Sequence, residues 1–476
     1  MNFNVINNEC KSKSIISILF SVFFLVIFNF FFSFIPIGHY SVALKRIIIA
    51  ISIFLIVDTL TIYYVEQSIF SLSVMFIWLS YLFNYGQVFT NVLFPNHKYS
   101  VMNIIQRFGN SNMITALLFA ANIIQIVFIG FLFENALNVK IVVKRKKLMD
   151  KGNVEKYGER MCRYIGAIIC IICFPMRMYY TFSAMQIVRA KGYETSTVEG
   201  FSGTYIQIST FCVVGSVMLL LSFANDKKKA SLVLGIESVL FLFMMLSGGR
   251  IFSVNAIIII WYCYLKTGHN IRKRNFIIAL IFAVIILKVI PVITDLRVET
   301  GISINKIMNG YVTSDKSLVL SILDEFGGSI YTVYETMIEV PDKLSFNYGM
   351  SYIRSFALIG FNIGGVLSRI SQNVEYTTLF ENKGSYGGNY VGELYYNFGS
   401  FAYIFAIFLG LFVKKISNEF DNLLAAKKYY SLAFLVMPVY AVLMWVRGYF
   451  DSFTRGTAWA ALLIWALAKI LEKAKA

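Results

Sequence analysis

The feature that most constrains this chain is a series of apolar runs, each about 20 residues long, that recurs from one end to the other. A helix of that length spans the roughly 30 Å hydrocarbon core of a bilayer. The sequence is 58% hydrophobic and only 14% charged, which is more apolar surface than one soluble core buries. Short alternating segments of the outer-membrane barrel type are absent, so helices must satisfy the backbone in lipid. The sequence therefore predicts an all-α, polytopic membrane helical bundle.

About twelve transmembrane helices can be placed on these runs. They begin near Ser14, Arg46, Ser68, Met113, Tyr164, Tyr205, Ser231, Ile251, Phe276, Leu394, Tyr429 and Thr457. With the N-terminus inside, the lysines and arginines gather in the inner segments, among them 140–163, 227–229 and 414–428. Because basic loops face the cytoplasm, we expect a multi-pass protein of the bacterial inner (plasma) membrane with both termini cytoplasmic.

This topology divides the chain into three parts. Residues 1–296 would carry the first nine spans, residues 297–393 would form one large outer loop, and residues 394–476 would carry the last three spans. The formal charge of +17 is then explained by orientation in the membrane, and no nucleic-acid partner is expected.

The large outer loop contains two apolar stretches. Apolar residues from Val319 to Met337 recur at helical spacing before Pro341, which predicts one amphipathic helix lying on the membrane or on the bundle. The stretch 352–370 carries Arg354 and is interpreted as interfacial or re-entrant, because one more crossing would place the later lysines outside.

Polar residues near the outer face are the candidates for chemistry, because a charge at membrane depth costs several kcal/mol unless it is compensated. Arg250 ends a Ser-Gly-Gly-Arg turn, where two glycines let the backbone come close and the guanidinium can enter a cavity. The alternative is a tight turn with a snorkelling arginine. Arg297 closes the ninth span and could equally be an interfacial anchor.

Two further segments carry candidate residues. Arg447, Asp451 and Arg455 are spaced four residues apart, so on one helix they would share a face; the alternative is a structural Arg–Asp–Arg network. The Gly- and Tyr-rich stretch 384–399 predicts irregular backbone at the bilayer edge, beside a protein-lined cavity. Its tyrosines could stack on sugar rings, although tyrosines are common at membrane interfaces.

Several motifs are missing. The sequence has no Walker A loop, no dinucleotide-binding glycine fingerprint and no HExxH, and its outer segments contain no Asp-x-Asp pair that could hold a divalent metal. None of its three histidines lies in the large outer loop. We therefore expect neither a cofactor nor a metal site.

Two short motifs, 248–250 and 393–399, together with the large late outer loop and the arginine-bearing last outer loop, resemble the O-antigen and capsule polymerase (Wzy) family. The resemblance implies a fold similar to the GT-C class and a glycosyltransferase that joins undecaprenyl-pyrophosphate-linked repeat units at the outer face of the inner membrane. The related O-antigen ligases carry a candidate catalytic histidine in the large outer loop. This loop has none, which favours the polymerase and puts in doubt a mechanism that needs an imidazole base.

The resemblance also implies roles and partners. Donor and acceptor would be undecaprenyl-pyrophosphate-linked oligosaccharides within membrane lipid, with a chain-length regulator protein as a further candidate partner. Arginine binds phosphate oxygens bidentately and can stabilise a pyrophosphate leaving group without a metal, and a carboxylate can serve as general base. Glu393 is the first candidate for the base and Asp451 the second. The expected substrate-binding residues are Arg250, Arg297, Arg354, Arg447, Arg455, Tyr395, Tyr396 and Asn397.

Two other functions stay open at this point. A twelve-helix transporter, above all a flippase for the same lipid-linked unit, should show two matching halves, short outer loops and polar residues near mid-membrane. Charges within the spans, such as Asp58, Arg177 and Glu237, fit that alternative. A non-catalytic membrane scaffold in a polysaccharide assembly complex is the other.

Overall fold

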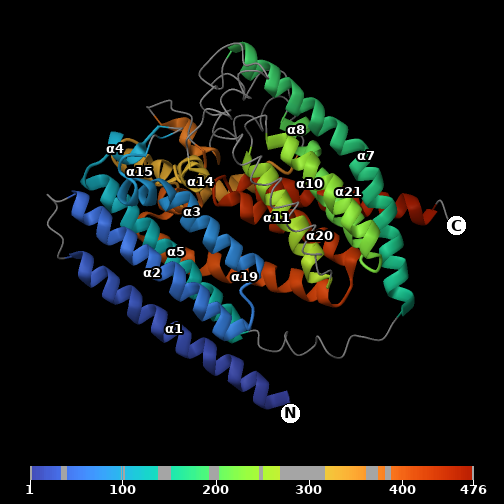
Figure 1. Cartoon of the computed structure of the whole chain (residues 1–476), viewed down its shortest axis with the longest axis horizontal. Helices are drawn as coiled ribbons and strands as arrows, with labels where there is room; N and C mark the ends of the chain where they lie inside the picture. The colour runs from blue at the N-terminus through green and yellow to red at the C-terminus, as the bar shows by residue number, and fades with distance from the viewer. Residues whose placement is uncertain are drawn as a thin grey trace. The chain divides into compact units, whose positions relative to one another are not determined.

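The structure is a computed structural model that describes residues 3–33, 40–97, 99, 102–137, 152–191, 203–245, 250–268, 317–360, 374–380 and 387–473. All regular elements in these residues are helices (Figure 1). The predicted all-α, polytopic membrane bundle is confirmed. The likeness to the GT-C class stays a prediction.

Seven helical segments of the described residues are long and apolar enough to cross a membrane. They are Lys11–Ser33, Tyr40–Glu66, Leu72–Leu93, Ser111–Leu137, Tyr157–Ile187, Gly203–Leu221 and Tyr390–Ala425. A shorter apolar helix covers Tyr429–Trp445. The spans expected from Ser231, Ile251 and Thr457 also fall on helices, whereas the one expected from Phe276 lies outside the described residues.

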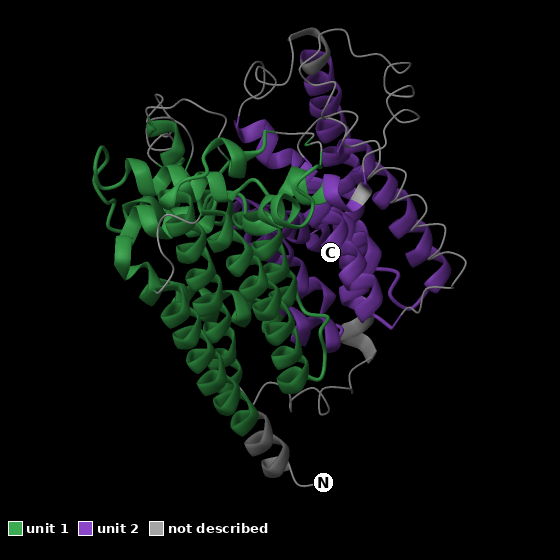
Figure 2. Cartoon of the chain, turned by 60° about the vertical axis from the view of Figure 1, so that its left-hand side comes forward, with its two compact units in different colours: residues 1–147, 322–419, 445–455 green, residues 148–321, 420–444, 456–476 purple. Residues whose placement is uncertain are grey.

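The described residues group into two compact units, each assembled from separate stretches of the chain (Figure 2). Unit 1 comprises Met1–Lys147, Ile322–Glu419 and Trp445–Arg455, and unit 2 comprises Leu148–Ser321, Phe420–Met444 and Gly456–Ala476. The division at residues 296 and 393 concerns the position of the chain relative to the membrane and stays a prediction.

In unit 1, long helices pack along one another and carry short helices at one end (Figure 1). Helix α5 contacts α1, α2 and α3, and also the short helices α15 and α18. The helices are α1 (Phe3–Ser33), α2 (Tyr40–Glu66), α3 (Leu72–Leu93), α4 (Ile104–Arg107), α5 (Ser111–Leu137), α15 (Ile330–Glu339), α16 (Met350–Ala357), η3 (Tyr376–Leu379), α18 (Tyr390–Phe398), η4 (Gly399–Phe401) and most of α14 (Leu318–Phe326) and α19 (Ala402–Ala425).

Unit 2 is built around α9, which packs against α7, α10 and α11. Its helices are α7 (Gly152–Lys191), α8 (Gly203–Ser209), α9 (Cys212–Leu221), α10 (Lys227–Met244), α11 (Arg250–Lys266) and most of α20 (Tyr429–Trp445) and α21 (Asp451–Lys473).

The single amphipathic helix expected over 319–337 is wrong, because the structure breaks it into α14 and α15. The break falls at Gly327, where an added Cβ would lie 2.4 Å from the Cα of Gly86. The backbone of Ser329 then donates a hydrogen bond to the carbonyl of Phe83, 3.0 Å away. A backbone-to-backbone crossing with α3 therefore replaces the continuous helix.

Two other features of the predicted outer loop can be followed in part, and its place outside the membrane stays a prediction. Helix α15 ends at Glu339, before Pro341, and packs against α3, α5 and α18. It therefore lies on the bundle. In the second apolar stretch, α16 is only 8 residues long, too short to cross a bilayer, and residues 361–373 lie outside the described part of the chain.

A buried ion pair joins α19 to α2 and α3 within unit 1. The Nζ atom of Lys414 lies 2.6 Å from Glu66 Oε1 and donates to the hydroxyl of Ser73 at 3.1 Å. The lysine is 1% exposed. A charge buried this far is costly unless it is paired and hydrogen-bonded, so these contacts determine how α19 lies on its neighbours.

Small residues let α5 and α19 touch closely. A Cβ on Gly130 would lie 2.5 Å from the carbonyl oxygen of Ile407 and 2.9 Å from the Cα of Gly410. Glycine at both positions permits the contact, as in small-residue packing between membrane helices. This crossing sets the position of α19, which follows the candidate site in the chain.

We expect Gly130→Ala to lower the thermal stability of the purified protein in detergent, because the new methyl group forces the two helices apart. Overpacking of this kind costs about 1–3 kcal/mol. Gly235→Ala is the matched control, because nothing lies within 4 Å of a Cβ at that position. Alanine also has a higher helix propensity than glycine. Equal melting temperatures for the two variants would contradict the crossing.

Candidate functional site

An asparagine cap fixes the start of α18, the helix that carries Glu393. The side-chain oxygen of Asn389 accepts a hydrogen bond from the backbone N–H of Val391 at 2.9 Å, a common N-cap arrangement. Its amide group donates to Asn84 Oδ1 at 2.8 Å and to the carbonyl of Ser329 at 3.1 Å. The first turn of α18 is thereby tied to α3 and to the turn before α15.

The chain before α18 crosses the turn that follows α20. A Cβ on Gly388 would lie 2.4 Å from the carbonyl carbon and oxygen of Gly448. A side chain at Gly388 would therefore push the two segments apart. Gly388 serves this close approach. Among the described residues of the 384–399 stretch, the expected irregular backbone is limited to 387–389 and to Gly399, whose φ is positive, because Tyr390–Phe398 form the regular helix α18.

The carboxylate of Glu393 is completely buried. Its Oε2 atom accepts hydrogen bonds from the indole N–H of Trp445 at 2.6 Å and from the backbone N–H of Phe450 at 3.2 Å. Among the described residues, Oε1 has no hydrogen-bond partner. Oε2 therefore holds the turn after α20, and the Ser351 hydroxyl, which pairs with Asn397, is a further polar neighbour of the carboxylate.

Asn397 lies one turn further along α18 and is fully buried. Its amide group donates to the carbonyl of Glu393 and to the hydroxyl of Ser351, both at 2.8 Å. The Ser351 hydroxyl donates back to Asn397 Oδ1 at 3.1 Å. Asn397 therefore anchors α16 to α18, and its side chain is already engaged by protein groups.

The two neighbouring tyrosines pack against other rings. Tyr396 stacks on Tyr376 with centroids 4.8 Å apart, and Tyr376 meets the edge of Tyr449 at 5.7 Å. Tyr395 contacts Phe119 at 5.3 Å. One face of Tyr396 is thus covered by protein, and the hydroxyl of Tyr449 pairs with that of Thr377.

The expectation that Arg447, Asp451 and Arg455 share one helix face is wrong. Helix α20 ends at Trp445 and α21 begins at Asp451, so Arg447 lies in the turn between them. The turn forms because the N–H of Phe450 binds Glu393 and Gly448 packs on Gly388. Only the aspartate and the second arginine are on one helix.

The carboxylate of Asp451 lies near charges of both signs. It interacts electrostatically with Glu375, which carries like charge, and with Arg455, one turn along α21. Asp451 is partly exposed, in contrast to Glu393. Burial raises the pKa of Glu375, which lies in the outer loop just before η3. Two acidic side chains and an arginine therefore meet beside the turn.

The other arginines of unit 1 lie around the same elements. The guanidinium of Arg447 sits 5.7 Å from the centre of the Phe83 ring and close to Gly387. Arg354 is in the last turn of α16 and interacts electrostatically with Tyr396. The structure therefore gathers Arg354, Arg447 and Arg455 in one unit with both candidate carboxylates.

The remaining two candidate arginines are not part of this group. Arg250 belongs to unit 2, where it is buried at the start of α11, and Arg297 lies outside the described residues. Unit 2 also buries Arg177, whose guanidinium stacks 3.8 Å from the centre of the Phe252 ring. The convergence of Arg250 with Arg447 and Arg455 stays a prediction.

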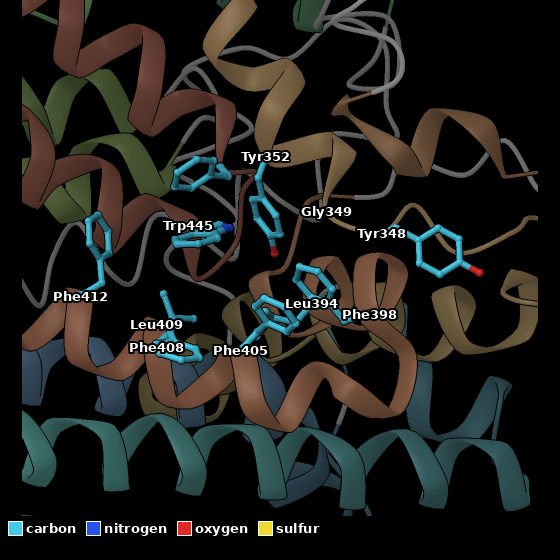
Figure 3. A pocket seen from close by; sticks show the side chains of 11 residues that line it. Tyr348, Gly349, Tyr352, Leu394, Phe398, Phe405, Phe408, Leu409, Phe412 and Trp445 are labelled. Carbon is cyan, nitrogen blue, oxygen red and sulfur yellow. The ribbon is translucent and has the colours of Figure 1, made fainter.

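A cavity of about 480 Å³ adjoins the Glu393 turn (Figure 3). Trp445 and Phe450, the two residues whose N–H groups hold the carboxylate, both line it, and so does Leu394. The rest of its lining comes from α16, the segment before it, and the α18–α19 segment. The buried polar contact and the apolar cavity therefore share two residues.

Sequence reasoning missed Trp445, Phe450, Ser351 and Tyr352, which surround Glu393. Phe450 lies inside the Arg447–Arg455 run, but nothing in the sequence pairs that run with α18. His97 was also missed. Its imidazole lies 2.5 Å from the buried carboxylate of Asp324, so a histidine contacts the segment predicted as the outer loop, although that segment itself contains none. In the described part of the chain, no group of three or more His, Cys, Asp or Glu side chains could hold a metal ion.

Comparison with protein families gives one match. The family model described as O-antigen polysaccharide polymerase Wzy matches residues 15–475, nearly the whole chain. Comparison with curated proteins and with solved structures gives no match.

We expect Trp445→Phe to destabilise the protein by about 1–3 kcal/mol, because the ring is kept while a buried carboxylate loses a donor. The measurement is the melting temperature in detergent. Trp78→Phe is the matched control, because its indole N–H donates to the neutral hydroxyl of Thr59 and no buried carboxylate loses a donor. A loss no larger than that of the control would show that the Trp445–Glu393 contact contributes little.

Proposed function

We propose the reaction of this chain on the basis of its family. The chain belongs to the O-antigen polysaccharide polymerase Wzy family. In this proposal it joins undecaprenyl-pyrophosphate-linked oligosaccharide repeat units into O-antigen or capsular polysaccharide. One observation carries the proposal most directly. A buried carboxylate, one oxygen of which has no hydrogen-bond partner among the described residues, lies in the same unit as three arginines and an apolar cavity. Membership in a polymerase family favours this reaction over transport or a scaffold role.

The chemistry is a transfer between two lipid-linked saccharides. A hydroxyl of the acceptor attacks the anomeric carbon of the donor, the bond from that carbon to the pyrophosphate oxygen breaks, and the lipid pyrophosphate leaves with the bonding electrons. The hydroxyl proton goes to a carboxylate acting as general base. Positive charge must meet the developing charge on the leaving pyrophosphate.

Glu393 is the first candidate for the base, because its Oε1 lacks a hydrogen-bond donor among the described residues while Oε2 is anchored at 2.6 Å. A base fixed through one oxygen keeps the other for the proton. Because Glu393 has no exposed surface, the acceptor hydroxyl would reach Oε1 only when the side chains around it move. The alternative gives Glu393 the role of fixing the turn and makes Asp451 the base, since Asp451 is partly exposed.

Arginines are proposed to bind the pyrophosphates without a metal. The guanidinium is always charged, and its planar fork matches two phosphate oxygens. Arg354, Arg447 and Arg455 in unit 1 are the proposed ligands of one substrate, and Arg250 in unit 2 is a further ligand. Tyr395 and Tyr396 would line the saccharide path, and Asn397 would support them from within α18.

The distribution of basic residues supports action at the outer face of the inner membrane, with both termini cytoplasmic. The lipid-linked donor and acceptor are the partners in this proposal, and a chain-length regulator protein is a further one. The arginine-bearing turn after α20 and the segment that contains Arg354 would then face the periplasmic side.

Glu393→Gln should abolish polymerisation of lipid-linked repeat units by the purified protein, because the amide can still accept hydrogen bonds from Trp445 and Phe450 but cannot take up a proton. Asp451→Asn is the matched variant and should reduce the rate less. Product ladders and melting temperatures are measured together. Normal ladders from Glu393→Gln with lost activity in Asp451→Asn would exchange the two roles.

Arg455→Lys and Arg250→Lys should each slow polymerisation by on the order of a hundredfold, because lysine keeps the charge but loses the bidentate contact to a developing pyrophosphate charge. Arg107→Lys is the control, since Arg107 is exposed at the end of α4 and stacks on Phe108. Near-normal rates in both test variants, at melting temperatures equal to wild type, would assign these arginines to structural contacts.

A further inference from the structure

We propose that the apolar cavity of unit 1 holds the polyprenyl chain of the lipid-linked oligosaccharide and so brings its pyrophosphate to the Glu393 turn. The inference rests on the proposed function and adds to it the place where the lipid binds. The cavity is lined by 11 residues, none of them charged (Figure 3). Its occupant must therefore be apolar over this stretch.

One wall of the cavity is a single face of α19. Phe405, Phe408, Leu409 and Phe412 follow the i, i+3, i+4, i+7 spacing that puts side chains on one side of a helix. This face extends about 10 Å along the helix axis. It lies within the candidate membrane span Tyr390–Ala425, and Phe408 is 60% exposed. The cavity is therefore open beside an exposed apolar face of a candidate membrane helix.

The opposite wall is a group of rings around the Glu393 contact. The ring centroids of Trp445 and Phe450 lie 4.8 Å apart. The rings of Tyr352 and Phe450 form an edge-to-face pair with centroids 5.3 Å apart. Figure 3 shows Tyr352 and Trp445 facing the α18–α19 side of the cavity. The same indole that covers the cavity donates its N–H to Glu393 at 2.6 Å. A chain in the cavity would thus end beside the proposed base.

Charged residues lie next to the lining residues Trp445 and Phe450 along the chain. Asp451 directly follows Phe450, Arg455 comes one turn later on α21, and Arg447 lies two residues after Trp445. An apolar slot that leads to arginines complements an amphiphile with a long apolar tail and an anionic head. At about 480 Å³ the cavity has the size of a pocket for a drug-sized ligand, roughly 300–1,000 Å³, so it holds a part of such a chain next to the head.

The cavity is preformed, because its rings are held by one another, as in the stacked pair Phe398 and Phe405 with centroids 3.5 Å apart. A ligand that enters a preformed slot does not have to order its walls. The polyprenyl chain is chosen over the acyl chain of a phospholipid because the substrate of the proposed function carries it.

The test is photo-crosslinking with a short polyprenyl phosphate that carries a diazirine on its chain. The full-length protein is placed in nanodiscs of phosphatidylglycerol, so that an anionic phospholipid competes throughout. The crosslinked residues are mapped by mass spectrometry. Leu409→Trp fills the cavity, and Ile404→Trp is the matched control on the same helix, 52% exposed to lipid and not part of the lining.

We expect labelling of wild type within 405–412, loss of that label with excess unlabelled polyprenyl phosphate, and no effect of Ile404→Trp. Leu409→Trp should reduce labelling about tenfold, the effect of excluding roughly two methylene groups from the slot. If the label in the wild-type protein is found only outside 405–412, this result alone overturns the inference, and no variant is needed. Equal labelling of Leu409→Trp and Ile404→Trp, or equal capture of a diazirine-bearing phosphatidylglycerol, would also overturn it.

The readout is capture of a lipid phosphate and involves no sugar transfer, so it separates the two proposals. A protein that captures the probe in the cavity but never extends repeat units would refute the polymerase function and leave the lipid site intact. A protein that extends repeat units but labels outside 405–412 would refute only the lipid site.

Discussion

The arrangement of unit 1 depends on one buried carboxylate. Glu393 has no exposed surface, and a charge in such a place is tolerated only when it is hydrogen-bonded. Trp445 and Phe450 supply the donors, which fixes the turn between α20 and α21 against α18. That turn carries Arg447 and leads into Asp451. The position of these charged residues therefore follows from the hydrogen bonds to a single carboxylate.

Close backbone contacts supply the second constraint. In lipid there is no hydrophobic driving force for helices to associate. Their association depends instead on van der Waals packing, which small residues make possible at close range. Gly130 with Gly410, Gly86 with Gly327, and Gly388 with Gly448 are three such contacts. The first places α19, the second sets the break between α14 and α15, and the third places the approach to α18. All three therefore surround the elements that carry Glu393 and the cavity.

The sequence predicted those features that depend on local pattern. Apolar length gave the spans, and Pro341 marked the end of α15. The break at Gly327 was missed because helical periodicity continues through it, and only the contact with Gly86 interrupts the helix. Arg447 was placed on a helix for the same reason, since its turn depends on Glu393, more than fifty residues earlier in the chain. Long-range pairing, such as that of His97 with Asp324, leaves no trace in a single sequence.

In the proposed function, the boundary between Phe450 and Asp451 is where the lipid-binding cavity meets the charged side chains. A substrate that is half lipid and half charged saccharide cannot be held by a polar site alone, because its tail must stay in an apolar medium while its pyrophosphate stays near cations. In unit 1 the aromatic lining of the cavity ends at Phe450, and the acidic and basic side chains begin at the next residue. The bond that breaks in the proposed reaction joins the anomeric carbon to the pyrophosphate, on the side of the head that is away from the tail. A site that holds the tail in the cavity and the pyrophosphate near the arginines would therefore place this bond beyond the head, on the side of the charged residues.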